Sequence, residues 1–165
     1  MRRLLLIRHA KSSHKFEDLD DHERPLNKRG ERDALSMARH LADKGEAIDV
    51  LYSSTAHRAL DFAQIISEFT GISLIPELSF YTFDVDELIE ILRNLPDDAN
   101  NVAVVLHNPA ITQAVNRLTD SDLNNVPTAG MVALNCDIEN WRGLGELVSD
   151  CEVDYFDYPK MLNNA

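Results

Sequence analysis

The sequence predicts an α/β fold, a three-layer α/β/α sandwich whose sheet is mainly parallel with an antiparallel strand at its C-terminal end. Three short, continuously apolar segments are typical of parallel strands buried on both faces, namely residues 4–8, 48–52 and 102–107. Amphipathic helical segments alternate with these strands through short connections. Alternation of this kind places helices on both faces of one sheet.

The helices of the first half have recognisable ends. A helix over residues 31–44 stops at Gly45. After the second strand, another helix begins near Ser54, a suitable N-cap, and stops at Gly71. The expected buried faces consist of Ala34, Leu35, Ala38, Leu41 and Ala42 in the first helix, and of Ala59, Phe62, Ala63, Ile66 and Phe69 in the second.

The second half continues this alternation. A short strand over residues 72–75 precedes a helix that begins with a capping box of Asp84 and Glu87 and ends before a proline. Asn108 and Pro109 open the next helix. The elements expected up to this point complete the parallel part of the fold.

The tail predicts two further strands. Residues 131–138 and 147–153 should pair antiparallel around a turn at residues 141–145. Cys136 and Cys151 are too few and too far apart for a zinc cluster, and in a reducing compartment they would remain thiols with a structural role. Because they could face each other on the two strands, a disulfide is the alternative.

Composition and charge narrow the classes of function. The chain has 165 residues, of which 44% are apolar and 27% charged, and this indicates one folded domain over residues 1–165. A formal net charge of -12 repels nucleic-acid phosphates and anionic membranes, so phosphate chemistry requires a local cluster of cations. The first apolar segment is interrupted at Arg8 before a signal peptide or membrane span is complete. We therefore expect a cytoplasmic protein with no membrane or nucleic-acid partner.

Polar residues follow the strands at the edge where parallel sheets bind ligands. Arg8 and His9 end the first strand, Arg58 lies in the helix after the second, and His107 ends the segment 102–107. Arginine binds phosphate oxygens bidentately, and neutral imidazole is a nucleophile near neutral pH. One histidine would attack phosphorus while the other, protonated beside a bound phosphate, would stabilise the developing charge. Because the arginines add to this stabilisation, no metal or other cofactor is required.

At these residues the sequence resembles the histidine phosphatase superfamily, which has the phosphoglycerate mutase-like fold, and within it the compact SixA-like phosphohistidine phosphatases. The resemblance rests on four ordered motifs, at residues 6–12, 24–30, 53–59 and 107–109. It implies that His9 carries the phosphoryl group as a covalent intermediate. It also implies that Arg8, Arg58 and His107 form the phosphate pocket.

The proton donor for the leaving group is less strongly indicated. Larger phosphatases and mutases of the superfamily use a carboxylate on an inserted segment, for which this chain has little room. Glu77, which follows the third strand, is the candidate general acid, and a capping or solvated role is its equal alternative. Lys11 and His57 are expected at the pocket rim or on the surface.

A weak or missing acid favours a phosphoramidate substrate, because imidazole can leave as a neutral molecule whereas an alkoxide needs a proton. An open pocket would also admit a protein side chain. The expected partner is therefore a phosphorylated protein, for example a histidine phosphotransfer domain. The alternatives are a phosphomonoesterase or mutase acting on a small phosphate ester, a metal hydrolase, and a module that binds phosphate without turnover. The short chain weighs against a mutase, and two arginines beside the candidate ligands weigh against a bound cation.

Overall fold

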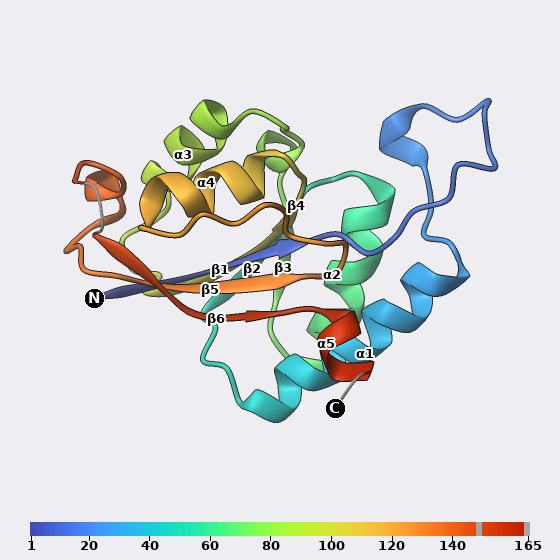
Figure 1. Ribbon diagram of the computed structural model, residues 1–165, viewed down its shortest axis with the longest axis horizontal. Coiled ribbons are helices and arrows are strands. Elements are labelled where there is room, and N and C mark those ends of the chain that lie inside the picture. Colours follow the sequence, from blue (N-terminus) through green and yellow to red (C-terminus); the bar gives the residue numbers. More distant parts are fainter. Residues whose placement is uncertain (148–149, 164–165) are drawn as a thin grey trace.

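A computed structural model describes residues 1–147 and 150–163 (Figure 1). In this part of the chain, a six-stranded sheet has the order β3-β2-β4-β1-β5-β6. The strands are β1 (Arg2–Arg8), β2 (Val50–Ser53), β3 (Leu74–Pro76), β4 (Asn101–Leu106), β5 (Met131–Cys136) and β6 (Cys151–Asp157). The first four pair parallel, β5 pairs antiparallel with β1, and β6 pairs antiparallel with β5.

Helices cover both faces of the sheet (Figure 1). One face packs against α3 (Val85–Arg93) and α4 (Ala110–Leu118), and the other against α1 (Lys28–Lys44) and α2 (His57–Thr70). A short helix, α5 (Pro159–Asn163), follows β6 and contacts α1. The 3-10 turns are η1 (Asp21–Glu23), η2 (Leu78–Phe80) and η3 (Trp141–Gly143). The predicted three-layer α/β/α sandwich is confirmed.

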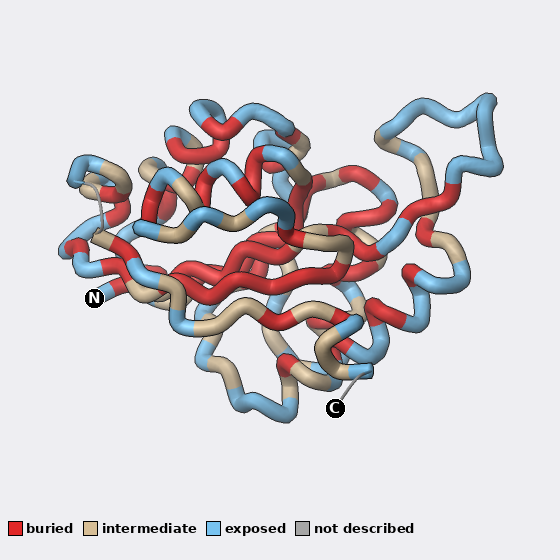
Figure 2. Tube along the Cα trace, viewed as in Figure 1, coloured by how far each residue is buried: buried red, intermediate tan, exposed pale blue. Residues whose placement is uncertain are grey.

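The central strand β1 is buried along most of its length (Figure 2), which explains its continuously apolar sequence. Leu4 and Leu6 belong to the core beneath α3 and α4, whereas Leu5 and Ile7 belong to the core above α1 and α2. A slip of one residue would exchange these two sets between the faces, so burial specifies the register of the strand. That register determines where β1 ends, and therefore where His9 begins the following loop.

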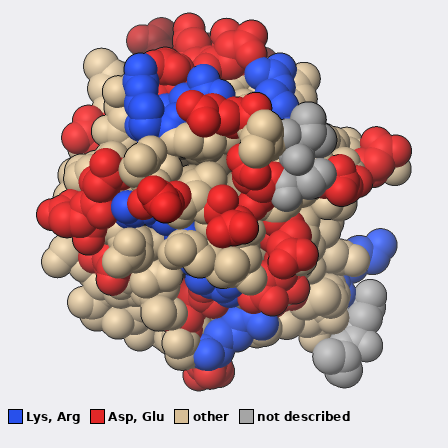
Figure 3. Space-filling view, turned by 90° about the vertical axis from the view of Figure 1, so that its left-hand side faces the viewer, with Lys and Arg blue, Asp and Glu red and all other residues tan. Residues whose placement is uncertain are grey.

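The amino ends of the parallel strands lie at the left of Figure 1, and Figure 3 shows this end of the molecule from outside. Asp and Glu side chains are more abundant than Lys and Arg across this view. The acidic excess of the chain is thus visible at the end away from the carboxyl edge of the sheet.

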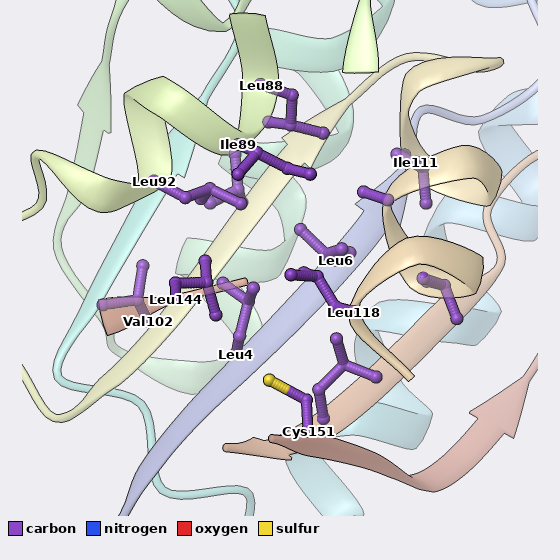
Figure 4. Close-up of a cluster of buried hydrophobic side chains, with 14 of the residues drawn as sticks. Leu4, Leu6, Leu88, Ile89, Leu92, Val102, Ile111, Leu118, Leu144 and Cys151 are labelled. Atoms are coloured by element: carbon purple, nitrogen blue, oxygen red, sulfur yellow. The ribbon is translucent and has the colours of Figure 1, made fainter. Parts of the chain in front are cut away.

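The core between the sheet and α3 with α4 is built from aliphatic side chains of both layers. Figure 4 shows Leu4 and Leu6 of β1 facing Leu88 and Leu92 of α3, and all four are fully buried. Full burial of one leucine side chain stabilises a fold by about 1.5–3 kcal/mol before entropic costs. This packing fixes α3, and with it the segment that precedes α3 at the functional edge.

Of the predicted caps of α2 and α3, the first is wrong and the second is confirmed only in part. Ser54 does not cap α2, because the helix begins at His57 and Ala56 occupies the N-cap position. The Ser54 hydroxyl instead accepts a hydrogen bond from the Ala56 N–H at 3.2 Å and lies 2.7 Å from Nε2 of His107. Asp84 does cap α3, since its carboxylate accepts a hydrogen bond from the Asp86 N–H at 3.0 Å. Glu87, however, accepts from the Thr82 hydroxyl at 2.7 Å and closes no capping box.

Two predicted core positions are also wrong. Leu35 is 48% exposed and Phe69 is 37% exposed. In α1, Met37 is buried in place of Leu35. The helical periodicity therefore located the correct face of each helix but not its full width.

The C-terminal pairing is as predicted, with different details. The expected turn at 141–145 contains η3, and Trp141 is fully buried there. β6 begins at Cys151, and residues 148–149 of the predicted strand lie outside the described residues. Cys136 and Cys151 lie opposite each other and form a disulfide, so the expectation of free thiols is wrong. Over the described ranges, no helix combines the length and apolarity that crossing a membrane requires.

Candidate active site

Arg8, His9 and Arg58 line one cavity at the carboxyl edge of the parallel strands. β1 supplies Arg8 and leads directly into His9, and the first turn of α2 supplies Arg58. The cavity has a volume of about 440 Å³. Its charged lining residues are Arg8, Lys11, Asp21, Arg24 and Arg58. Four cations against one carboxylate make this cavity suited to an anion.

His9 presents one imidazole nitrogen for attack. Its Nδ1 lies 2.7 Å from the carbonyl oxygen of Ala10, so Nδ1 carries the proton and donates it in a hydrogen bond. Nε2 is then the unprotonated nitrogen, and Nε of Arg58 lies 3.4 Å from it. Burial, reinforced by the charges of Arg58 and Arg8, lowers the pKa of His9 to about 3. The imidazole is therefore neutral at physiological pH, as a nucleophile must be.

Arg58 is the hub of the site, and its side chain is 2% exposed. Its Nη1 donates to the backbone carbonyl of Asp21 at 2.6 Å, and its Nη2 donates to the Asp21 carboxylate at 3.0 Å. The same Nη2 lies 3.5 Å from Nδ1 of His107. The guanidinium thus joins both histidines to the η1 segment.

Asp21 is a residue that sequence reasoning missed. It precedes the Arg24 motif by one turn, and its carboxylate also accepts a hydrogen bond from the Tyr81 hydroxyl at 2.7 Å. Burial alone would raise the pKa of Asp21, but the hydrogen bonds from Tyr81 and Arg58 lower it to about 2. An acidic residue just before the motif at residues 24–30 was the available signal.

His107 is fully buried, and its ring centroid lies 5.2 Å from that of His9. Nε2 bonds to the Ser54 hydroxyl, which leaves Nδ1 facing Arg58. Burial, with smaller effects of His9 and Arg58, lowers the pKa of His107 to about 2. In this structure the second imidazole is therefore neutral, whereas the predicted mechanism requires it to be protonated beside a bound phosphate.

The Arg8 side chain has one hydrogen-bond donor that is used and one that is not. Its Nη1 donates to the carbonyl of Val126 at 2.9 Å, which fixes the side chain. Its buried Nε has no hydrogen-bond partner among the described residues. A buried donor without a partner costs free energy, so a site that contains one is suited to an acceptor such as a phosphate oxygen.

Comparison with known proteins agrees with this geometry. A profile of the histidine phosphatase superfamily (branch 1) matches residues 4–87. The chain belongs to this superfamily. An uncharacterised protein of Mycobacterium leprae is 31% identical over 141 residues, which cover 78% of this chain and 86% of that protein. The predicted enzyme class, a phosphatase, is confirmed.

Two solved structures that carry the provisional name phosphohistidine phosphatase SixA are similar over nearly the whole chain. The Nakamurella multipartitia structure is 27% identical with a TM-score of 0.75 and covers 96% of both chains. The Agrobacterium tumefaciens structure is 23% identical with a TM-score of 0.81 and covers 96% of this chain and 98% of that one. The predicted phosphoglycerate mutase-like fold and the likeness to the SixA-like branch are confirmed.

The motif at residues 24–30 of this histidine phosphatase clamps the loop that follows His9. Backbone N–H groups of Ser13 and Asn27 donate to Pro25 and Lys11 at 2.8 and 3.0 Å. Gly30 lies so close that a Cβ atom there would be 2.0 Å from the carbonyl oxygen of Lys11. Only glycine permits this approach of α1 to the loop.

Glu77 is not brought to this cavity, so the geometry does not support it as the general acid. It lines a different cavity of about 410 Å³, together with Tyr52, Phe80 and Pro96. Glu77 follows β3, and the strand order places β2 and β4 between β3 and β1. Three strand spacings separate these positions by roughly 14 Å.

Lys11 and His57, which were expected at the pocket rim or on the surface, are found there. Lys11 is exposed and contributes to the cavity lining. His57 is exposed, and its Nε2 lies 3.0 Å from the carboxylate of Asp61. Lys11 therefore adds positive charge at the rim of the cavity, and His57 is a surface residue.

Proposed function

We propose that this protein is a metal-independent phosphatase that transfers a phosphoryl group to Nε2 of His9 and then to water. The observation that carries the proposal is the neutral, cavity-lining imidazole of His9 with Nε of Arg58 at 3.4 Å from its free nitrogen. The guanidiniums of Arg8 and Arg58 are placed to balance the charge of a phosphoryl group in transfer.

The reaction divides into two displacements at phosphorus. In the first, the lone pair of His9 Nε2 forms a bond to phosphorus while the bond to the leaving group breaks with its electron pair. Nδ1 keeps its proton throughout. It donates this proton in a hydrogen bond to the carbonyl oxygen of Ala10, which fixes the orientation of the ring. In the second, water attacks the phosphohistidine, releases inorganic phosphate and restores neutral His9.

The substrate we propose is phosphohistidine in a protein, for example in a histidine phosphotransfer domain. Asp21 is the only carboxylate among the described residues that line the cavity, and its pKa of about 2 keeps it ionised at neutral pH. An alkoxide leaving group would need a stronger proton donor than this. Imidazole whose second ring nitrogen is protonated leaves as a neutral molecule and needs none. The likeness to proteins named SixA supports the same class of substrate.

Trapping of the intermediate tests the mechanism. Brief incubation with a 32P-labelled phosphoramidate should label the protein through an acid-labile, alkali-stable bond that maps to His9. His9→Ala should abolish both labelling and turnover, whereas His57→Ala, at a surface histidine, should retain both. EDTA should leave the rate unchanged. Labelling at a serine or an aspartate, or equal rates for wild type and His9→Ala, would overturn the proposal.

A small phosphate ester is the second candidate substrate, because a cavity of about 440 Å³ also accommodates a sugar phosphate. The two candidates are separated by kcat/KM on a phosphohistidine-containing protein and on a panel of sugar phosphates. Comparable values for both would remove the preference for phosphohistidine and leave a general phosphomonoesterase.

A further inference from the structure

Two aromatic residues of the segment between η2 and α3, Tyr81 and Phe83, form a cluster with His107 beside the cavity, and Phe83 lines it. The ring of Phe83 lies 4.9 Å from that of His107 and 5.5 Å from that of Tyr81. Tyr81 lies 5.5 Å from His107 in turn, with an edge-to-face orientation. The three rings contact one another, so Phe83 is supported from within the protein rather than projecting alone.

Phe83 nevertheless retains exposed surface. It is 43% exposed and lines the cavity that contains His9. A large apolar ring exposed inside a cavity of cations does not contribute to binding phosphate oxygens. Exposed apolar surface in a ligand cavity is typical of a contact with an apolar part of the ligand.

The backbone on both sides of Phe83 is fixed. The Thr82 side chain is buried and bonds to Glu87, and its hydroxyl accepts a hydrogen bond from the Asp84 N–H at 3.3 Å. Asp84 then caps α3. The ring is therefore held in place before a ligand arrives, which reduces the entropic cost of using it as a contact.

We propose that Phe83 determines specificity by stacking on a flat, aromatic leaving group, such as the imidazole of phosphohistidine or the ring of an aryl phosphate. This inference rests on the proposed phosphatase function and adds to it a residue that selects what phosphorus is attached to. His9 and Phe83 both contact the ring of His107, so a group bound to phosphorus at His9 lies beside Phe83. Offset or edge-to-face contacts between such rings are favourable beyond simple burial.

Two donors with the same bond type test this idea. Phosphoimidazole and phosphoramidate both contain a P–N bond, but only the first has an aromatic leaving group. Phe83→Ala should lower kcat/KM for phosphoimidazole by about three- to tenfold. The value for phosphoramidate should change by less than about twofold, because that donor has no ring to lose the contact.

Further variants distinguish stacking from general apolar contact. Phe83→Trp should restore the preference for phosphoimidazole, whereas Phe83→Leu should not. Leu78→Ala, at a 67% exposed residue outside the cavity lining, is the matched control and should leave both rates unchanged. Thermal melting of each variant confirms that the fold is retained.

The outcomes separate this inference from the proposed function. Equal losses for both donors in Phe83→Ala, or full activity of Phe83→Leu on phosphoimidazole, would overturn the stacking role while the phosphatase function stands. Failure of the wild type to hydrolyse either donor in a His9-dependent manner would overturn the proposed function itself, and the stacking role with it.

Discussion

At the level of single side chains, the site depends on keeping imidazoles neutral among arginines. Arg58 places a positive charge beside both histidines, and burial removes the water that would stabilise an imidazolium ion. The Asp21 carboxylate compensates the charge of Arg58 through an ion pair with Nη2 at 3.0 Å. The arrangement leaves the lone pair of His9 free, but it also makes the folded protein less stable as the pH falls.

The first prediction concerns that pH dependence. The pKa of His9 is about 3 in the folded protein against an ordinary value of 6.5, so the unfolded chain binds more protons between these pH values. The contribution of His9 to stability is complete above pH 6.5 and is lost as the pH falls toward 3. Between pH 6 and pH 5 this loss amounts to about 1 kcal/mol.

Urea unfolding of wild type and His9→Asn at pH 7, 6 and 5 measures this contribution. The variant should lose about 1 kcal/mol less than the wild type between pH 6 and pH 5. His57→Gln controls for loss of a histidine outside the cavity. Parallel curves for wild type and His9→Asn would show that the folded protein does not disfavour protonation of His9.

At the level of elements, the loop that carries His9 follows the end of a strand and is held by the start of a helix. β1 delivers His9 to the edge of the sheet, and the N-terminus of α1 holds the loop through Asn27 and Gly30. The Asn27 side chain accepts a hydrogen bond from the Gly30 N–H at 2.8 Å, so the helix cap and the clamp are one structure. Residues outside the cavity lining therefore set the position of His9.

Gly30→Ala is accordingly expected to lower both stability and activity. The added Cβ would meet the backbone of Lys11, which cannot rotate away as a side chain can. Overpacking of this kind costs about 1–3 kcal/mol, and the shift of the loop should reduce kcat as well. Gly143→Ala is the matched control, since its Cβ would meet atoms only at 3.9 Å and beyond. Urea unfolding and steady-state kinetics check both variants, and wild-type behaviour of Gly30→Ala would refute the clamp.

At the level of the whole molecule, the disulfide and the candidate active site lie at opposite ends of the strands. Cys136 pairs with Arg2 at the start of β1, whereas Arg8 ends the same seven-residue strand. Roughly 20 Å of extended chain separates the two ends. The disulfide should therefore support stability without touching the reaction.

Reduction of the disulfide tests this separation. The bond closes a loop with a sequence separation of 15, for which loop-closure entropy predicts a stabilisation of about 3 kcal/mol. Cys136→Ser with Cys151→Ser, or the reduced wild type, should show a lower urea midpoint with an unchanged kcat/KM. Mock-treated oxidised protein is the control. A change in kcat/KM at temperatures where the variant is folded would indicate that the two ends are coupled.

Much of the fold followed from local pattern. The apolar strands, the helices between them and the meeting of Arg8, His9, Arg58 and His107 at one edge could be predicted, because parallel strands bring their carboxyl ends together. Glu77 could not be excluded in the same way. Its distance from His9 depends on the order of the strands in the sheet, which no local pattern encodes.

By itself, the sequence determined the elements, the class of sheet and a cationic edge suited to an anion. The tertiary structure alone decided that Asp21 and Tyr81 meet Arg58, that Phe83 borders the cavity and that the two cysteines pair. Periodicity and strand ends are properties of short segments and can be read along the chain. Contacts between loops depend on how strand order, helix packing and connection length bring distant segments together, and these are settled only when the whole chain packs.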